Sequence, residues 1–151
     1  MKKINKVFGK REKNKIYIDR EGVYIIAEKD GYVATVKTPR GYFLPGGGIE
    51  KNESHFDCIK RECLEEIGYD IVIADYLCTA EIFTVHDRLG YFHPIQHYYC
   101  GKLVSKVTEP VETTHSFEWL TFTEAMKKMY VQAQKWAVKK YFSDISLRET
   151  T

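Results

Sequence analysis

Three glutamates lie close together in one short segment of this 151-residue chain: Glu62, Glu65 and Glu66. On a helix that turns by about 100° per residue, the three side chains fall within an arc of roughly 100°. Like charges this close repel one another, and Arg61, four residues before Glu65, cannot neutralise all three. Clustered oxygen ligands are what a hard divalent cation requires, and Mg²⁺ also takes phosphate oxygens from a substrate. The cluster favours a metal site for phosphate chemistry, with a solvated acidic face as the alternative.

An apolar stripe runs beside this acidic face, formed by Phe56, Ile59, Cys63 and Ile67. It predicts that the helix packs on the core, with the carboxylates at the edge of the interface and facing a cleft. Upstream, Gly46–Gly48 joins a strand to the helix, and glycine lets the backbone come close to a ligand. A glycine run alone equally suits a flexible turn, but here its amides and carbonyls are expected beside the carboxylates.

Strands are expected on both sides of this segment, from runs rich in Ile, Val and Tyr that are separated by turn residues. The predicted strands are Lys15–Asp19, Gly22–Ala27, Tyr32–Thr38, Tyr42–Leu44, Ile71–Tyr76, Leu77–Val85, Tyr91–Ser105 with an interruption, and Phe117–Thr121. Lys29-Asp30-Gly31 predicts a hairpin turn before the third of them.

The acidic helix is expected from about Ser54 to Ile67. Ser54 and Asp57 suit a capping box at its start, and Gly68 stands where a C-terminal glycine belongs. The chain ends helically, with a second capping box at Thr121 and Glu124 and a further helix over 132–141. This order predicts one domain over residues 1–151, with a mixed sheet and helices packed on its faces.

The segment from Gly47 to Tyr69 resembles the Nudix box, G-x5-E-x7-R-E-U-x-E-E-x-G-U, in which U is a bulky aliphatic residue. Every spacing is kept, through Gly47, Glu53, Arg61, Glu62, Glu65, Glu66 and Gly68. Cys63 and Tyr69 replace aliphatic residues, and both are packing positions. The chain is therefore identified as a member of the Nudix (MutT-like) hydrolase family. The resemblance implies an α+β Nudix fold, an α/β/α sandwich around a mixed β-sheet.

The resemblance also implies a metal centre that uses Mg²⁺, or Mn²⁺ in its place. By position, the metal ligands are Glu62, Glu65 and Glu66, with the Gly46 carbonyl as a candidate backbone ligand. A metal ion neutralises charge on a diphosphate and makes its bound water a usable nucleophile at neutral pH. Glu62 is one candidate for the base that takes the proton of this water.

Supporting roles fall to other positions of the same motif. Arg61 is expected to orient a box carboxylate, and Glu53 to hold the loop against the helix, as residues behind metal ligands do. The glycines Gly47, Gly48 and Gly68 are expected at positions where the backbone needs freedom. Outside the motif, Glu112 is either a distal ligand or base, or an exposed loop acid.

The substrate class follows from the family more than from other residues. We expect hydrolysis of the diphosphate linkage of a nucleoside diphosphate derivative, foremost a nucleoside triphosphate cleaved to monophosphate and pyrophosphate. A catalytically silent Nudix fold that senses a nucleotide is the alternative. Arg40 either contacts phosphate or is solvated, and the ring-rich run 91–99 either stacks a base or packs in the sheet. Markers of the ADP-ribose, dinucleoside polyphosphate and coenzyme A branches are not found.

Composition also bears on where the protein is located, on the state of its cysteines and on what it binds. No apolar stretch is long enough to span a bilayer, and the basic start of the chain lacks the apolar core of a signal peptide, so a cytoplasmic protein is expected. The four cysteines show no metal spacing and are expected to be reduced and mostly buried. Residues 1–15 carry a net charge of +6 against +2 for the whole chain. We interpret this arm as a solvated edge and expect a small nucleotide-like substrate, not nucleic acid, as the partner.

Overall fold

The computed structural model describes residues 3–111 and 113–150, with 147–150 described by their backbone alone. The strands are β1 (Lys6–Phe8), β2 (Ile18–Lys29), β3 (Tyr32–Thr38), β4 (Gly41–Phe43), β5 (Gly46–Gly48), β6 (Tyr69–Ile82), β7 (Thr84–His86), β8 (Gly90–Lys106) and β9 (Ser116–Thr121). The helices are α1 (His55–Glu66), α2 (Phe122–Lys128) and α3 (Gln132–Thr150).

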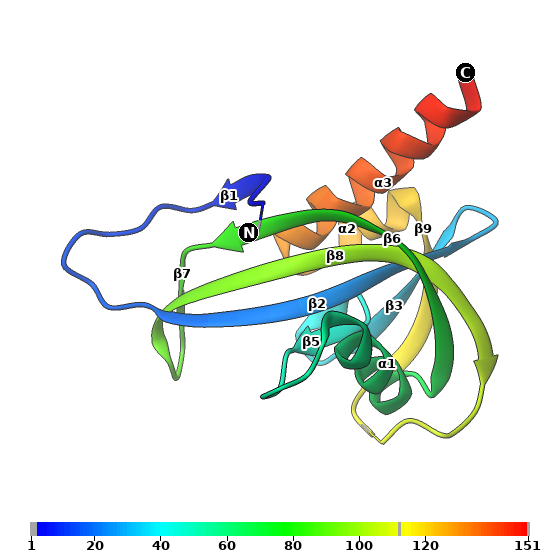
Figure 1. The fold of residues 1–151 in the computed structure, drawn as a ribbon, viewed down its shortest axis with the longest axis horizontal. Helices are drawn as coiled ribbons and strands as arrows, with labels where there is room; N and C mark the ends of the chain where they lie inside the picture. The colour runs from blue at the N-terminus through cyan, green and yellow to red at the C-terminus, as the bar shows by residue number, and fades with distance from the viewer. Residues whose placement is uncertain (1–2, 112, 151) are drawn as a thin grey trace.

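Three long strands, β2, β6 and β8, form the centre of a mixed sheet (Figure 1). β8 lies between the other two, antiparallel to β6 and parallel to β2. The order across the sheet is β1-β6-β8-β2-β3-β4, while β5 pairs with β2, β7 with β8 and β9 with β3. The mixed sheet predicted from the sequence is thus confirmed.

The central strands are longer than the sequence predicts. The predicted strands Lys15–Asp19 and Gly22–Ala27 are joined in the single strand β2, which begins only at Ile18, because Arg20 between them continues the parallel ladder with β8. Ile71–Tyr76 and the greater part of Leu77–Val85 are likewise joined in β6, whose ladder contains register shifts. A bulge of this kind adds a residue without ending the strand. The alternation of polar and apolar residues in the sequence is then interrupted, although the backbone continues as one strand. β6 ends at Ile82, and Val85 belongs to β7.

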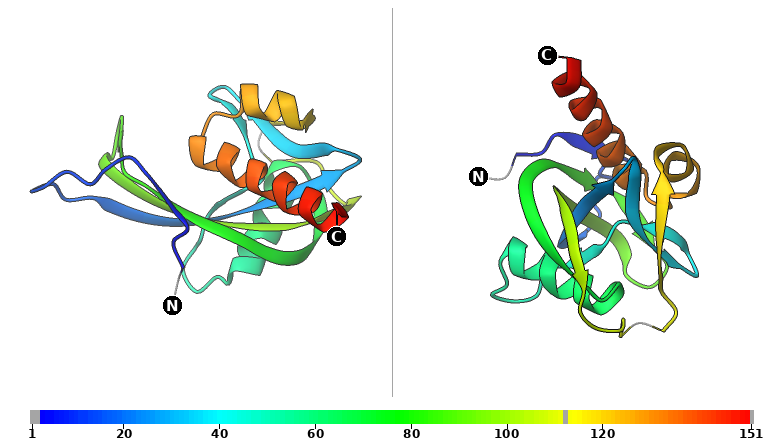
Figure 2. Two further views of the ribbon diagram at one scale, coloured as in Figure 1. Left: turned by 90° about the horizontal axis from the view of Figure 1, so that it is seen from above. Right: turned by 90° about the vertical axis from the view of Figure 1, so that its right-hand side faces the viewer.

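Helix α1 lies on one side of the sheet, and α2 and α3 lie on the other (Figures 1 and 2). Each side has its own apolar core. The core on the α1 side buries Val23, Ile25, Val36, Cys58, Ile59, Cys63, Ile67 and Ile71. The core under α2 and α3 buries Ile26, Val33, Leu44, Cys78, Ala80, Tyr98, Leu120, Ala125, Met129, Ala133, Ala137 and Val138. Residues of one strand thus point alternately into the two cores, on opposite faces of the sheet. This arrangement confirms the predicted α/β/α sandwich.

Both ends of α1 are defined by residues that the sequence marked. The Ser54 side chain accepts a hydrogen bond from the Asp57 N–H at 3.1 Å. Gly68 has φ +76°, and its N–H donates to the Cys63 carbonyl at 2.9 Å. The predicted apolar stripe is wrong at Phe56, which is 52% exposed, because the buried contacts of α1 begin only at Cys58. Thr121 and Glu124 form the predicted capping box of α2.

The glycine run is a strand and not the loop that the sequence suggested. Gly46–Gly48 forms β5, antiparallel to residues 22–24 of β2. Gly46 has φ +143°, and a Cβ on it would lie 2.2 Å from the Val23 carbonyl oxygen. Glycine is therefore required where the two backbones approach most closely, and the pairing holds the run beside α1.

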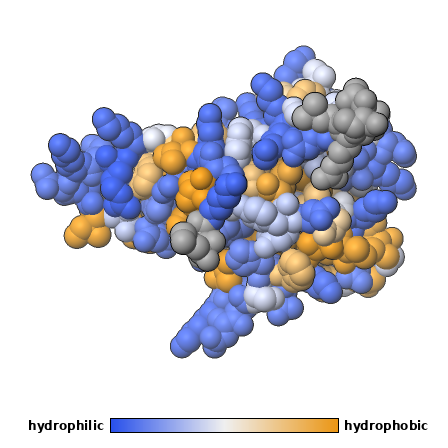
Figure 3. Space-filling view, turned by 45° about the horizontal axis from the view of Figure 1, so that its top comes forward, coloured by the Kyte–Doolittle hydropathy of each residue, from blue (hydrophilic) through white to orange (hydrophobic). Residues whose placement is uncertain are grey.

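The first part of the chain runs along an end of the molecule that is covered mainly by hydrophilic side chains (Figures 1 and 3). The Arg11 guanidinium lies 4.8 Å from the Tyr17 ring centroid and 4.9 Å from that of Phe83. Lys15 lies 5.4 Å from the Tyr91 ring centroid. These cations therefore pack on aromatic rings at the surface.

Two further features complete the fold. No helix in the described part of the chain is long and apolar enough to cross a membrane. Cys58, Cys63 and Cys78 are buried free thiols and Cys100 is half-buried, as predicted.

Candidate active site

Arg61 is the centre of the polar contacts at the exposed side of α1. Its Nε donates to Glu53 Oε2 at 2.6 Å and its Nη2 to Glu53 Oε1 at 3.0 Å, which is a two-point guanidinium–carboxylate pair. The hydrogen bond from Arg61 lowers the pKa of Glu53 to about 2, and this bond in turn raises the pKa of Arg61. Glu53 also accepts from the Glu50 N–H at 3.0 Å. The pair fastens the segment before α1 to the helix.

The other nitrogens of Arg61 reach the acidic face and the glycine strand. Nη1 donates to Glu62 Oε1 at 2.9 Å and to Glu65 Oε2 at 3.3 Å. Nη2 donates to the Gly48 carbonyl at 3.1 Å. One side chain therefore joins β5, the loop after it and two box carboxylates.

The glycine strand lies directly against two of the three box glutamates. Glu66 Oε1 accepts a hydrogen bond from the Gly46 N–H at 2.9 Å. A Cβ on Gly47 would lie 2.7 Å from the Glu62 carboxylate carbon, closer than such atoms approach one another. Glycine at position 47 therefore makes room for a carboxylate and does not serve a positive φ.

The three carboxylates differ in their surroundings. The side chains of Glu62 and Glu66 are 16% and 13% exposed, while that of Glu65 is 42% exposed. Burial raises the pKa of Glu62, and the facing Arg61 opposes this shift. The site thus holds carboxylates at graded depths along one helix edge.

The donor set fits a hard divalent cation in its chemistry. It offers carboxylate oxygens and the backbone of a glycine strand that Cβ atoms do not shield. Among the described residues, no three acidic, histidine or cysteine side chains converge as a ready metal cluster. The reason is visible in the contacts: Arg61 holds Glu62 and Glu65, and the Gly46 N–H holds Glu66.

A cavity of about 610 Å³ opens beside Glu66. Its lining includes Arg20, Tyr24, Thr38, Pro39, Arg40, Phe43, Leu44, Gly46, Glu66 and His115. A second hollow, of about 310 Å³, adjoins it through Arg20, Tyr24, Arg40 and Phe43, and reaches Gly47, Gly48 and Phe92. Two guanidinium groups and three aromatic rings therefore surround one end of the acidic face.

A family profile described as NUDIX domain matches residues 17–141 of this chain. The chain belongs to the Nudix hydrolase family. Nudix hydrolases of this pyrophosphohydrolase type act on nucleoside diphosphate derivatives. The match covers α1, the strands β2 to β5 before it and the strands β6 to β9 after it, so it includes the whole site.

Solved structures show the same fold. A NUDIX hydrolase from Nitrosomonas europaea matches with a TM-score of 0.72 and 20% identity, over 84% of this chain and 90% of that chain. A MutT NUDIX hydrolase from Burkholderia pseudomallei matches with a TM-score of 0.69 and 20% identity, over 82% of this chain and 98% of that chain. The dihydroneopterin triphosphate pyrophosphohydrolase of E. coli matches with a TM-score of 0.63 and 18% identity, over 84% of this chain and 97% of that chain. A comparison with curated proteins gives no match.

The structure brings together most of the residues that the Nudix motif singled out. Those gathered around β5 and α1 are Glu53, Arg61, Glu62, Glu65, Glu66, Gly46, Gly47 and Gly48. Gly68 lies apart, at the C-terminus of α1, where the Thr108 carbonyl fills the space of a Cβ. Arg40 lies in the lining of both hollows. Glu112 lies outside the described residues.

Sequence reasoning missed Arg20, Tyr24 and His115. Arg20 and Tyr24 share one face of β2, and the pairing of β2 with β5 brings them to the Nudix residues. His115 Nδ1 is buried without a hydrogen-bond partner among the described residues, 4.0 Å from Glu66 Oε2. The sequence does indicate that residues 20, 22 and 24 lie on one face of a strand. This alternation does not reveal which strand pairs with it.

The low pKa of Glu53 predicts a pH-dependent contribution to stability. Because its pKa falls from 4.5 to about 2 on folding, the Arg61 contact stabilises the protein fully above about pH 4.5. This contribution is lost as the pH falls towards 2. Urea unfolding of the wild type and of Glu53→Gln should show a stability difference that shrinks over this window. A difference that stays constant from pH 7 to pH 2 would show that the carboxylate charge is not responsible.

Proposed function

We propose that this Nudix hydrolase cleaves a nucleoside triphosphate to the monophosphate and pyrophosphate, with Mg²⁺ or Mn²⁺ held by Glu62, Glu65 and Glu66. The observation that carries the proposal is the cavity beside Glu66, in which Arg20, Arg40 and two aromatic rings stand next to the acidic face. Such a site offers anion contacts and a ring surface within reach of the same carboxylates. The similar structure from E. coli is named a dihydroneopterin triphosphate pyrophosphohydrolase, which supports a triphosphate as the substrate and pyrophosphate as a product.

The chain's own residues have separate tasks in this proposal. Bound divalent cations neutralise diphosphate charge and supply an activated water. Arg61 keeps Glu62 and Glu65 in place, and the Gly46 N–H does the same for Glu66. Arg20 and Arg40 bind phosphate oxygens through fixed planar donors. The rings of Tyr24 and Phe43 contact the base or the sugar.

The products identify the bond that breaks. No lysine follows the glycine run in the manner of a P-loop, so we expect water to attack a phosphorus within the triphosphate and to be the sole acceptor. The test is to incubate a panel of nucleotides in ¹⁸O-water, with and without Mg²⁺, and to analyse the products by mass spectrometry and ³¹P NMR. The label is expected in the nucleoside monophosphate or in pyrophosphate. Labelled inorganic monophosphate with accumulating nucleoside diphosphate would contradict the mechanism. Saturable binding without turnover would favour the nucleotide sensor.

Arg61→Ala is expected to weaken metal affinity by about 10–100-fold, the usual loss when a residue that orients metal ligands is removed. Isothermal titration with Mn²⁺ measures it directly, without turnover. Arg61→Lys serves as the matched variant, since it keeps the charge but loses the two-point contact with Glu53, and it should restore only part of the affinity. Unchanged affinity in Arg61→Ala would show that the role of Arg61 is misassigned.

Arg20→Ala and Arg40→Ala test the phosphate contacts. Each is expected to raise KM by about tenfold and to lower kcat less, because a contact made equally in the bound and the transition state affects binding. Lys127→Ala, which removes an exposed cation of α2 that lines neither hollow, is the control and should leave KM unchanged. Steady-state kinetics with the best nucleotide of the panel provide the measurement. Wild-type KM values in both cleft variants would remove these residues from the substrate site.

A further inference from the structure

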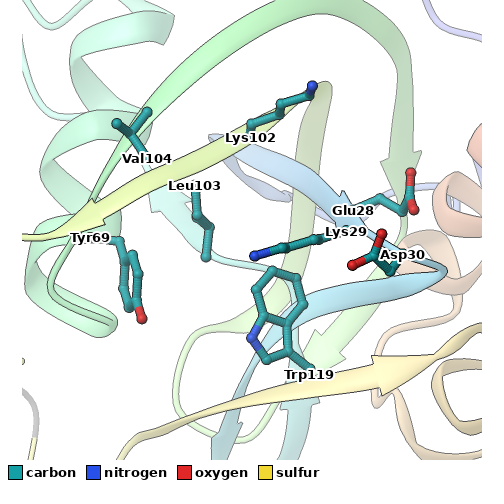
Figure 4. A pocket seen from close by; sticks show the side chains of 8 residues that line it. All are labelled: Glu28, Lys29, Asp30, Tyr69, Lys102, Leu103, Val104 and Trp119. Atoms are coloured by element: carbon teal, nitrogen blue, oxygen red, sulfur yellow. The ribbon is translucent and has the colours of Figure 1, made fainter.

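A separate cavity of about 560 Å³ lies between the end of β8, the β2–β3 hairpin and β9 (Figure 4). Its lining residues are Glu28, Lys29, Asp30, Tyr69, Lys102, Leu103, Val104 and Trp119. None of them lines the two hollows beside the glycine strand. The proposed hydrolysis therefore leaves this cavity without a role.

The indole of Trp119 forms one wall of the cavity (Figure 4). Trp119 is 37% exposed, and its ring centroid lies 5.2 Å from that of Phe117. Across the β3–β9 pair it stands opposite Ala34, a small and fully buried residue. A smaller hollow of about 270 Å³, lined by Lys29, Asp30, Tyr32 and Trp119, adjoins the cavity. The indole is therefore an open surface on which a flat ring can stack.

The charged residues around Trp119 do not form ion pairs with one another. Neither Lys29 nor Lys102 makes an ion pair with any residue that the structure describes, and Figure 4 shows the Lys29 side chain reaching over Trp119. Glu28 is engaged elsewhere: its Oε2 accepts from the Gly31 N–H at 2.8 Å and its Oε1 from the Tyr141 hydroxyl at 3.1 Å. The ammonium groups are thus free for a ligand.

Asp30 adds an acceptor to these donors. Its carboxylate lies on the same side of the cavity as the Lys29 side chain (Figure 4). One donor and one acceptor beside an open indole match the edge of a nucleobase, which carries both kinds of group. Lys102 is exposed and its ammonium points away from Trp119 (Figure 4), so a phosphate bound there would face solvent.

We propose that this cavity is a second ligand site, which binds a nucleoside monophosphate. The base stacks on Trp119, its edge contacts Lys29 and Asp30, and the phosphate lies by Lys102. The volume is within the range of small-molecule sites, about 300–1,000 Å³. Stacking on an aromatic side chain tolerates any base, so the site selects the class of ligand and not one base.

Fluorescence of Trp119 tests the proposal without any catalysis. The chain has two tryptophans, so Trp136→Phe leaves Trp119 as the sole reporter. Adenosine monophosphate is a suitable probe, because it has no diphosphate linkage to be cleaved. Saturable quenching is expected, and its absence at millimolar probe would overturn the proposal. If Trp136→Phe fails to fold, Trp119→Phe in the otherwise wild-type chain gives the same answer by abolishing the quenching.

Matched variants separate this cavity from the cleft beside Glu66. The double variant Lys29→Ala/Lys102→Ala should weaken binding of the probe at least tenfold. Arg40→Ala in the cleft and the exposed Lys51→Ala should each stay within twofold of the parent. Adenosine without phosphate should bind about tenfold more weakly than the monophosphate. Loss of quenching in Arg40→Ala with retention in the lysine variant would place the ligand in the cleft and refute the second site.

Discussion

Glu66→Gln should lower kcat at least ~10²-fold, the typical loss when one electrostatic element of a site is removed. Glutamine keeps the size of the side chain and an oxygen that can still accept the hydrogen bond from the Gly46 N–H. The change therefore removes a charge from the proposed metal site while the strand–helix contact persists. Steady-state kinetics at saturating Mg²⁺ measure the loss, and circular dichroism checks that the fold is kept.

Glu65→Gln extends this experiment to a side chain with little packing. Because Glu65 is 42% exposed, its replacement costs few contacts, and any large loss of activity belongs to its charge. Glu12→Gln is the matched control: Glu12 is exposed in the segment between β1 and β2 and lines neither hollow beside the glycine strand, so wild-type rates are expected there. Rates within threefold of wild type for both Glu65→Gln and Glu66→Gln would exclude them as metal ligands.

The local part of the site could be predicted because it is local in the chain. Glu53, Arg61 and Glu62 lie on one turn-and-helix unit, in which a fixed spacing gives a fixed geometry. The Arg61 contacts to that unit need no information about the rest of the fold. For the same reason the helix ends, at Ser54 and Gly68, were correctly placed.

The cleft could not be predicted in this way, because it depends on which strands pair. Arg20 and Tyr24 reach the site only because residues 22–24 of β2 pair with β5, more than twenty residues later. Such register depends on the packing of a whole sheet, and one sequence does not reveal it. The same limitation explains the predicted break in β2, where polar side chains at the sheet surface concealed a continuous ladder.

Gly47→Ala is expected to lower kcat by about 10²-fold, the effect of moving a catalytic group by roughly 1 Å. The added methyl group would lie 2.7 Å from the Glu62 carboxylate, so either the carboxylate or β5 must move. Gly31→Ala is the control. Its φ of +87° makes the substitution strained, but a Cβ there meets nothing within 4 Å and lies in a turn far along the sheet.

A double-mutant cycle shows whether the effect passes through Glu62. In the Glu62→Ala background the clash is absent, so Gly47→Ala should then cost far less stability in urea unfolding than it does with Glu62 present. Equal costs in the two backgrounds would mean that the methyl group disturbs only the β2–β5 pairing. Glycine at this position would then belong to the sheet and not to the metal-binding face of α1.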